Sequence, residues 1–200
     1  MTRYFYDTEF IEDGCVIDLI SIGIVREDGR EYYAQHSDFI SSEANEWVKE
    51  NVFPHLYLCH GSYGEIANPS YPNEYHFGIG NCGYENCPWR TRLQIRDEVL
   101  AFVNAGEGEP EFWGYYSAYD HVALCQLFGK MIDLPNGWPM YTRDLKQWCD
   151  DLGNPKLPIQ EGPEHNALAD ARWNRSVYDF LMVTQGMQYL RMEKEWKDRA

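Results

Sequence analysis

The sequence predicts a layered fold of the α/β class, with α+β as the alternative: a mixed central sheet that contains an antiparallel three-stranded meander and is flanked by helices. Two observations predict it. Three strand-like segments follow one another within the first forty residues, and a helix, one more strand and several further helices come after them. Segments in this order are typical of a sheet covered by helical layers.

The meander is predicted from three extended segments and the turns between them. Arg3–Phe10 is aromatic and extended, and Gly14 marks a turn. Val16–Arg26 is rich in Ile and Val, and the Asp28-Gly29 dipeptide predicts a hairpin before a returning strand over Glu31–Phe39.

Helices are predicted where apolar residues recur at helical spacing behind a capping residue. We expect a short helix over Ser42–Val52 capped by Ser42, a helix that begins after Thr91, and one over Ala118–Phe128 directly behind the aromatic strand Glu111–Tyr116. Thr142 is expected to cap Arg143–Leu152. A long helix is expected from near Glu164 to Lys197, with a weak point at Gly186.

Length and composition predict a single domain over residues 1–200. Residues 53–89 are the exception, because Gly, Pro, Asn and Tyr are frequent there and no helical period is present. A stretch of this length without regular structure is unusual inside a compact domain. We therefore predict a loop-rich insertion over 53–89.

The cellular environment is predicted from two missing signals. No apolar run approaches the ~20 residues that span a bilayer, so no membrane contact is expected. The N-terminal residues lack the apolar core of an export signal, so we expect a cytoplasmic protein whose six cysteines stay reduced.

The net charge of −15 disfavours broad attraction to nucleic acid, which usually binds basic surfaces. The charge has a second interpretation, since carboxylates gathered to hold metal ions contribute to it and bound ions reverse the local sign. The charge therefore directs attention to where the carboxylates lie.

Three short motifs contain the candidate catalytic residues. Asp7 and Glu9 lie two apart in a strand and therefore on one face. Asp120 follows a strand at the start of a helix, and His165 precedes Asp170 by five positions. The Gly162-Pro163 dipeptide just upstream predicts that His165 lies on a loop before the last helix proper. Taken singly, each has an ordinary alternative, namely an exposed strand end, an acid that complements a helix N-terminus, and a surface histidine.

Taken together, the motifs predict a metal site. Four carboxylates in one pocket repel one another unless cations neutralise them. Ligation by oxygen alone favours Mg²⁺ or Mn²⁺ over zinc. Two such ions can clamp the attacking and leaving oxygens of a phosphodiester, and a neutral His165 can take the proton of the attacking water.

The motifs resemble a known family. Asp7-Thr8-Glu9-Phe10, Tyr119-Asp120 and His165-x4-Asp170 are similar to the three exonuclease motifs of the DEDDh 3′-5′ exonucleases. The runs GWPMYTRDLKQ and EHNALADARWN, with Asp7–Ser21 and Trp89–Phe102, resemble the ribonuclease AS family of bacterial polyadenylate-specific exoribonucleases. The resemblance covers most of the chain apart from the insertion and the last twenty or so residues.

The resemblance implies an RNase H-like fold and hydrolysis of single-stranded RNA from its 3′ end. It also implies preference for poly(A), release of AMP, and a homodimer. Two Mg²⁺ ions, for which Mn²⁺ can substitute, would be held by Asp7, Glu9, Asp120 and Asp170, with His165 as the general base.

Substrate contacts are predicted from position and side-chain type, because aromatic rings stack on bases and basic groups bind phosphates. The candidates are Phe10, Ile11, Tyr116, Tyr119, Arg143 and Lys146. The alternatives are core packing for the apolar residues and a solvated helix surface for the basic ones.

The insertion contains a candidate structural zinc site formed by Cys59, His60, Cys82 and Cys87. Structural zinc takes four nitrogen or sulfur ligands in a closed tetrahedron. Free thiols packed against the main domain are the alternative.

Three functions remain open from the sequence. They are an exoribonuclease with preference for oligoadenylate, a DEDDh exonuclease that acts on DNA or short oligonucleotides, and a non-catalytic acidic binding protein. Retention of all five motif residues favours an enzyme, since a binding protein does not need them.

Overall fold

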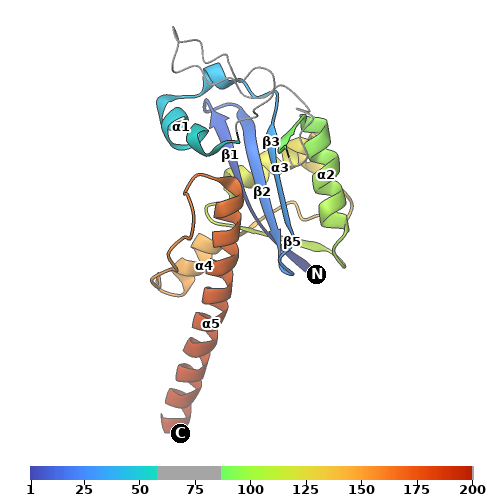
Figure 1. Ribbon diagram of the computed structural model, residues 1–200. Coiled ribbons are helices and arrows are strands. Elements are labelled where there is room, and N and C mark those ends of the chain that lie inside the picture. Colours follow the sequence, from blue (N-terminus) through green and yellow to red (C-terminus); the bar gives the residue numbers. More distant parts are fainter. Residues whose placement is uncertain (58–86, 200) are drawn as a thin grey trace.

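The computed structural model describes residues 1–57 and 87–199 and has the predicted α/β organisation. Its centre is a mixed six-stranded sheet with the strand order β4-β3-β2-β1-β5-β6, flanked by helices (Figure 1). Strands β1 (Thr2–Glu12), β2 (Ile17–Arg26) and β3 (Glu31–His36) form the predicted antiparallel meander. Strand β2 is buried along almost its whole length, which is typical of a strand whose two faces are both covered.

Three shorter strands extend the meander on both sides, each parallel to its neighbour. Strand β5 (Pro110–Gly114) pairs with β1, and β6 (Arg143–Asp144) pairs with β5. At the other edge β4 (Trp89–Arg90) pairs with β3. The sheet is therefore mixed, with β1 at its centre between an antiparallel and a parallel partner.

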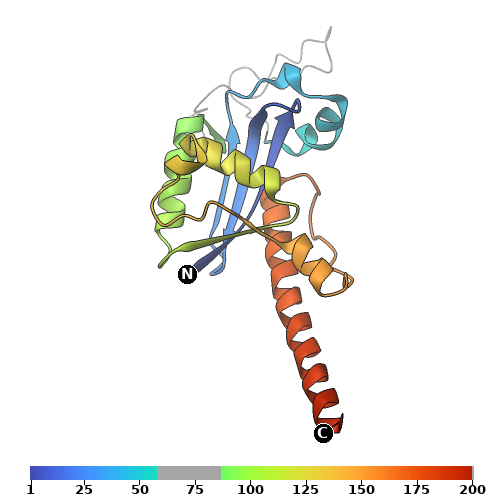
Figure 2. The same cartoon turned by 180° about the vertical axis from the view of Figure 1, so that it is seen from behind.

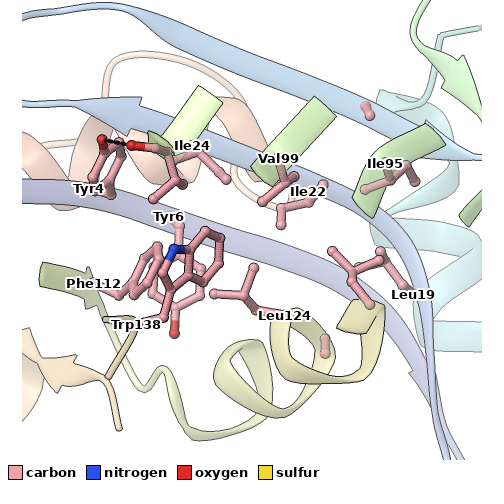
Figure 3. Close-up of a cluster of buried hydrophobic side chains, with 14 of the residues drawn as sticks. Tyr4, Tyr6, Leu19, Ile22, Ile24, Ile95, Val99, Phe112, Leu124 and Trp138 are labelled. Atoms are coloured by element: carbon pink, nitrogen blue, oxygen red, sulfur yellow. Dashed lines mark hydrogen bonds between the residues drawn. The ribbon is translucent and has the colours of Figure 1, made fainter. Parts of the chain in front are cut away.

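One face of the sheet is covered by α2 (Arg92–Asn104) and α3 (Ala118–Phe128). Figure 3 shows Tyr4 and Tyr6 of β1 packing with Ile95 and Val99 of α2 and with Leu124 of α3. The hydroxyl of Tyr4 donates to the carbonyl of Val103 at 2.7 Å, which satisfies its polar group inside the cluster.

The opposite face is covered by α4 (Leu145–Asp151) and α5 (Ala167–Arg199). Figure 2, seen from behind, has α3 in front of the sheet. Phe5 and Val25 of the sheet pack there against Leu145, Val177 and Leu181. Side chains alternate along a strand, so Asp7 and Glu9 of β1 share this second face with Phe5.

A smaller cluster closes the far end of β1. The short helices η1 (Ser41–Glu43), α1 (Glu46–Asn51) and η2 (Phe53–His55) lie there. Val48 and Phe53 bury their side chains against Ile11 and Ile20 of the sheet. The cluster fixes α1 beside the end of β1 that follows Asp7 and Glu9 (Figure 1).

The helix beginnings were predicted with mixed success. Thr91 caps α2 as predicted, in a capping box with Gln94. Ser42 does not cap α1, because Asn45 accepts the bond from the amide of Val48. Thr142 does not cap α4 either: Asp144 accepts from the amides of Lys146 and Gln147.

Helix α5 is continuous through Gly186, where a weak point was expected, and its second half projects from the sheet (Figure 1). No helix in the described ranges is both long and apolar enough to cross a membrane. The remaining short helix, η3 (Met131–Asp133), follows α3 after Gly129.

The zinc prediction falls mostly outside the described residues, since Cys59, His60 and Cys82 lie between 58 and 86. Cys87 is buried beside Trp89 in the cluster of α1. The predictions of an insertion over 53–89 and of a zinc site stay predictions. Among the described residues, Cys15, Cys87, Cys125 and Cys149 are not in disulfides, and the prediction that all six cysteines are reduced stays a prediction.

Candidate active site

The candidate site is built where α5 begins against the centre of the sheet. Gly23 of β2 lies opposite Asp7 of β1. A Cβ atom on Gly23 would lie 2.3 Å from the carbonyl oxygen of Ala167, the first residue of α5. Only glycine therefore allows the helix to approach the strand this closely.

A hydrogen bond holds α5 in this position. The side-chain amide of Asn174 donates to the carbonyl of Tyr6 at 2.9 Å, and Asn174 is buried. Asp170 lies one turn earlier on α5, so the bond beside Asp7 also fixes the place of the Asp170 carboxylate.

The structure brings three of the predicted carboxylates together. One oxygen each from Asp7, Glu9 and Asp170 lies within 4.8 Å of the others. The Oδ1 atom of Asp170 also accepts from the side-chain amide of Gln160 at 2.6 Å. An oxygen cluster of this size and chemistry could hold a divalent cation.

The fourth carboxylate, Asp120, lies in the first turn of α3 and lines the same cavity. Its Oδ1 atom accepts from both the amide and the hydroxyl of Thr8, at 2.9 Å and 2.6 Å. These bonds orient the carboxylate and leave Oδ2 for another partner.

Burial and mutual repulsion disfavour ionisation of the cluster. Burial, and then the nearby charges of Asp120, Glu9 and Asp170, raise the pKa of Asp7 well above its usual value. The same two causes raise the pKa of Glu9 to about 8. Burial raises the pKa of Asp120 to about 6 against the opposing bonds from Thr8, and it also raises the pKa of Asp170. A bound cation would relieve this repulsion.

The carboxylates face a cavity of about 660 Å³. Aromatic side chains line it beside the acids: Phe10, Tyr115, Tyr116 and Trp173. Tyr116 has a φ of 57° and is 66% exposed, so its ring stands at the surface of the protein. The cavity is thus lined by both carboxylates and aromatic rings. This combination suits a nucleotide, whose phosphate can bind metal ions held by the carboxylates and whose base can stack on the rings.

His165 lines the cavity and lies two residues before α5, as the Gly162-Pro163 dipeptide predicted. Its φ of 62° is uncommon for a residue with a side chain. The His165 ring contacts the indole of Trp47 edge to face, with 4.8 Å between the ring centroids.

The other predicted substrate contacts lie elsewhere. Ile11 is 5% exposed and packs in the cluster of α1, and Tyr119 contacts Phe10 with 5.8 Å between ring centroids but does not line the cavity. Arg143 pairs with Glu111 and lies over Trp113, and Lys146 pairs with Asp150. Their roles in binding RNA stay predictions.

Eight residues that line the cavity were not predicted from the sequence as part of the site: Thr8, Tyr115, Pro158, Ile159, Gln160, Glu164, Trp173 and Asn174. The sequence contained a signal for two of them, namely their helical spacing from Asp170. Trp173 and Asn174 follow Asp170 by three and four positions, so they share its helix face. Tyr115 and Gln160 lie on loops, where sequence spacing does not indicate direction.

Fold and site together define the class of the protein. It is an α/β protein with a carboxylate-lined cavity at the centre of a mixed sheet, a histidine at one wall and aromatic rings beside them.

Comparison with known proteins identifies the family. The sequence model of the 3′-5′ exoribonuclease Rv2179c-like domain matches residues 82–182. The chain is 43% identical over 171 residues to the 3′-5′ exoribonuclease Rv2179c of Mycobacterium tuberculosis strain H37Rv. The alignment covers 85% of this chain and 87% of the relative, and the 3′-5′ exoribonuclease MT2234.1 of strain CDC 1551 matches equally. The chain belongs to the family of the 3′-5′ exoribonuclease Rv2179c-like domain.

Proposed function

We propose that the protein is a metal-dependent exoribonuclease of the DEDDh type that removes nucleotides from the 3′ end of single-stranded RNA. Membership of a family of 3′-5′ exoribonucleases supports the reaction class. One observation supports the metal dependence: carboxylate oxygens of Asp7, Glu9 and Asp170 lie within 4.8 Å of one another.

The donor set fits divalent cations. All four side chains offer oxygen alone, the ligation that Mg²⁺ and Mn²⁺ prefer. Asp7, Glu9 and Asp170 would hold one ion, and Asp120, oriented by Thr8, would help to hold a second beside Asp7. When bound, two such ions neutralise the carboxylates and stabilise the charge that develops on the phosphodiester oxygens.

Proton transfer and binding of the bases are assigned to other residues of the cavity. His165 accepts the proton of the attacking water, and its place two residues before α5 puts it on the wall beside Asp170. Phe10 and Tyr116 stack on the terminal bases. The attack breaks the bond between phosphorus and the 3′ oxygen of the preceding nucleotide and releases a nucleoside 5′-monophosphate.

The sheet order supports an RNase H-like fold, since an antiparallel meander continues at β1 into the parallel strands β5 and β6. The likeness of GWPMYTRDLKQ and EHNALADARWN to the ribonuclease AS family supports poly(A) as the preferred substrate and AMP as the product.

A homodimer completes the proposal. Tyr189 and Leu190, on the projecting half of α5, are 63% and 67% exposed. These apolar side chains offer a surface on which a second copy can pack. Sedimentation analysis should show a species of twice the chain mass, and a monomer at all concentrations would remove this part of the proposal.

The catalytic proposal is tested with end-labelled oligo(A), oligo(U) and single-stranded DNA in Mg²⁺, Mn²⁺ or EDTA. We expect stepwise 3′ shortening of oligo(A) that EDTA abolishes. Asp7→Asn and Asp170→Asn should lower kcat by about 10³-fold or more, comparable to the loss of other groups that act in the transition state. Asp151→Asn, at an exposed position of α4, serves as the matched control and should keep full activity.

Other outcomes would redirect the assignment. Cleavage that persists in EDTA, or in Asp170→Asn, would refute the metal mechanism. Equal digestion of DNA and RNA would favour the alternative of a general DEDDh exonuclease. Binding of RNA without cleavage under any of these conditions would favour the non-catalytic protein.

A further inference from the structure

The loop that holds His165 has little regular structure of its own. It follows Gly162, whose φ is 127°, and His165 itself adopts a φ of 62°. Residues held in such conformations persist because surrounding contacts determine them. The contacts of His165 therefore decide where its imidazole lies.

The ring contact of His165 comes from a distant part of the chain. The indole of Trp47 lies edge to face with the imidazole, with 4.8 Å between the centroids and 78° between the ring planes. Edge-to-face contacts between aromatic rings are favourable and directional. The indole thus limits the rotation of the imidazole in the wall beside Asp170.

The neighbours of Trp47 on α1 fix the helix so that the indole points toward the loop that contains His165. Val48, the next residue, is buried in the cluster that contains Ile11. The amide of Val48 donates to the cap residue Asn45 at 2.9 Å. Trp47 itself is 52% exposed and belongs to none of the apolar clusters of the described residues, so core packing does not account for it.

A second contact joins the same two segments. The side-chain amide of Asn166 donates to the carbonyl of His55 at 3.3 Å, and its Oδ1 atom accepts from the amide of Ala169 at the start of α5. The residue after His165 is therefore tied both to α5 and to the end of η2. The segment from Asn45 to Leu56 and the His165 loop form one connected unit.

We propose that Trp47 is a positioning residue that fixes the imidazole of His165 for proton transfer, an inference that rests on the proposed role of His165. Trp47 does not line the cavity, so its loss should leave RNA binding nearly unchanged. A displacement of about 1 Å at a catalytic group can lower the rate by about 10²-fold. The effect should therefore fall on kcat and not on KM.

The test compares Trp47→Ala, Trp47→Phe and Trp196→Ala. Trp196 is 76% exposed on α5 and serves as the matched control. Trp47→Ala should lower kcat on oligo(A) by about 10-fold to 10²-fold with KM changed by less than about threefold. Trp47→Phe keeps an aromatic ring and should stay within about threefold of the parent, and Trp196→Ala should match it.

A spectroscopic measurement reports the contact without activity. The ring proton resonances of His165, identified by their loss in His165→Ala, should move in Trp47→Ala and stay in Trp196→Ala, because removal of the indole removes its ring-current field. On the His165→Ala background, Trp47→Ala should lower kcat no further.

The outcomes separate this inference from the proposed function. If Trp47→Ala keeps kcat within twofold while His165→Ala abolishes activity, His165 acts without help from Trp47 and the inference is wrong. If Trp47→Ala lowers kcat equally with and without His165, the effect is general and the inference is wrong. If His165→Ala itself keeps full activity, the proposed general base is wrong, whatever the resonances show.

Discussion

The two halves of α5 have similar apolar residues and opposite surroundings. In the first half, Ala167, Val177 and Leu181 are fully buried against the sheet and α4. In the second half, Leu190 and Trp196 are 67% and 76% exposed. Asp170 lies in the half that packs on the sheet. Burial along this helix is thus decided by the extent of the sheet beneath it, and the same contact places the carboxylate of Asp170, a proposed metal ligand.

The contact between Gly23 and Ala167 tests whether this packing places the active site. Gly23→Ala puts a Cβ 2.3 Å from a backbone oxygen, so helix and strand must separate. We expect a loss of more than about 3 kcal/mol of unfolding free energy and a large fall in kcat. Denaturant unfolding and the oligo(A) assay measure both, and a stable, fully active variant would contradict the role of this contact.

Two leucines nine positions apart compare the halves directly. Leu181→Ala should lower the unfolding free energy by about 2–5 kcal/mol, because it opens a cavity under α5. Leu190→Ala should change the stability of the monomer by less than about 0.5 kcal/mol. If two copies meet on this half, Leu190→Ala will instead lower Tm in a manner that depends on protein concentration. Equal losses at both positions in dilute protein would show that the second half also packs.

The pH dependence of the metal-free protein tests the charge cluster under the first half. The pKa of Glu9 is raised from 4.5 to about 8 in the folded protein. The folded state therefore binds the proton of the Glu9 carboxyl more tightly than the unfolded state does. The protonated carboxyl contributes its full stabilisation below about pH 4.5, and this contribution is lost as pH rises through about 8. Glu9→Gln lacks this ionisation and should be more stable than the parent by up to about 4 kcal/mol at pH 8 without metal. Mg²⁺ should raise the Tm of the parent more than it raises the Tm of Glu9→Gln.

Thermal unfolding in EDTA from pH 4.5 to 8.5 measures this difference. Exposed Glu50 on α1 provides the control, since Glu50→Gln should leave the pH profile of the parent unchanged. A parent protein whose metal-free stability rises between pH 5 and 8 would contradict the raised pKa of Glu9.

The smallest effect is expected at Gly186, which, unlike Gly23, lies in the exposed half of α5. A Cβ on Gly186 meets nothing within 4 Å among the described residues, and the helix is continuous there. Gly186→Ala should therefore raise the unfolding free energy by about 0.5–1 kcal/mol through helix propensity, with activity unchanged. A destabilised variant would show that this part of α5 is contacted.

Local contacts explain which elements could be predicted. The capping box of Thr91 and Gln94 needs only four consecutive residues, and the prediction was confirmed. Thr142 was a plausible cap for α4, but pairing of Arg143 and Asp144 with β5 moves the start of the helix to Leu145. A partner thirty residues away overrode the local signal.

The candidate site divides in the same way. The side chains of Asp7 and Glu9 share a face because strands repeat every two residues, so their pairing could be predicted from the sequence. Their meeting with Asp170 depends on Gly23 and Asn174, which admit and hold α5 beside β1. The contact of Trp47 with His165 depends on the position of α1, which the buried cluster around Val48 fixes against the sheet.

The sequence by itself determined the meander, most helices, the acidic motif residues and the position of His165 before the last helix, because each rests on neighbours within a few positions. Only the tertiary structure decided which half of α5 is buried, that the carboxylate oxygens meet within 4.8 Å and which ring contacts His165. Those features arise from contacts between residues more than a hundred positions apart, and their geometry follows from packing that no local pattern specifies.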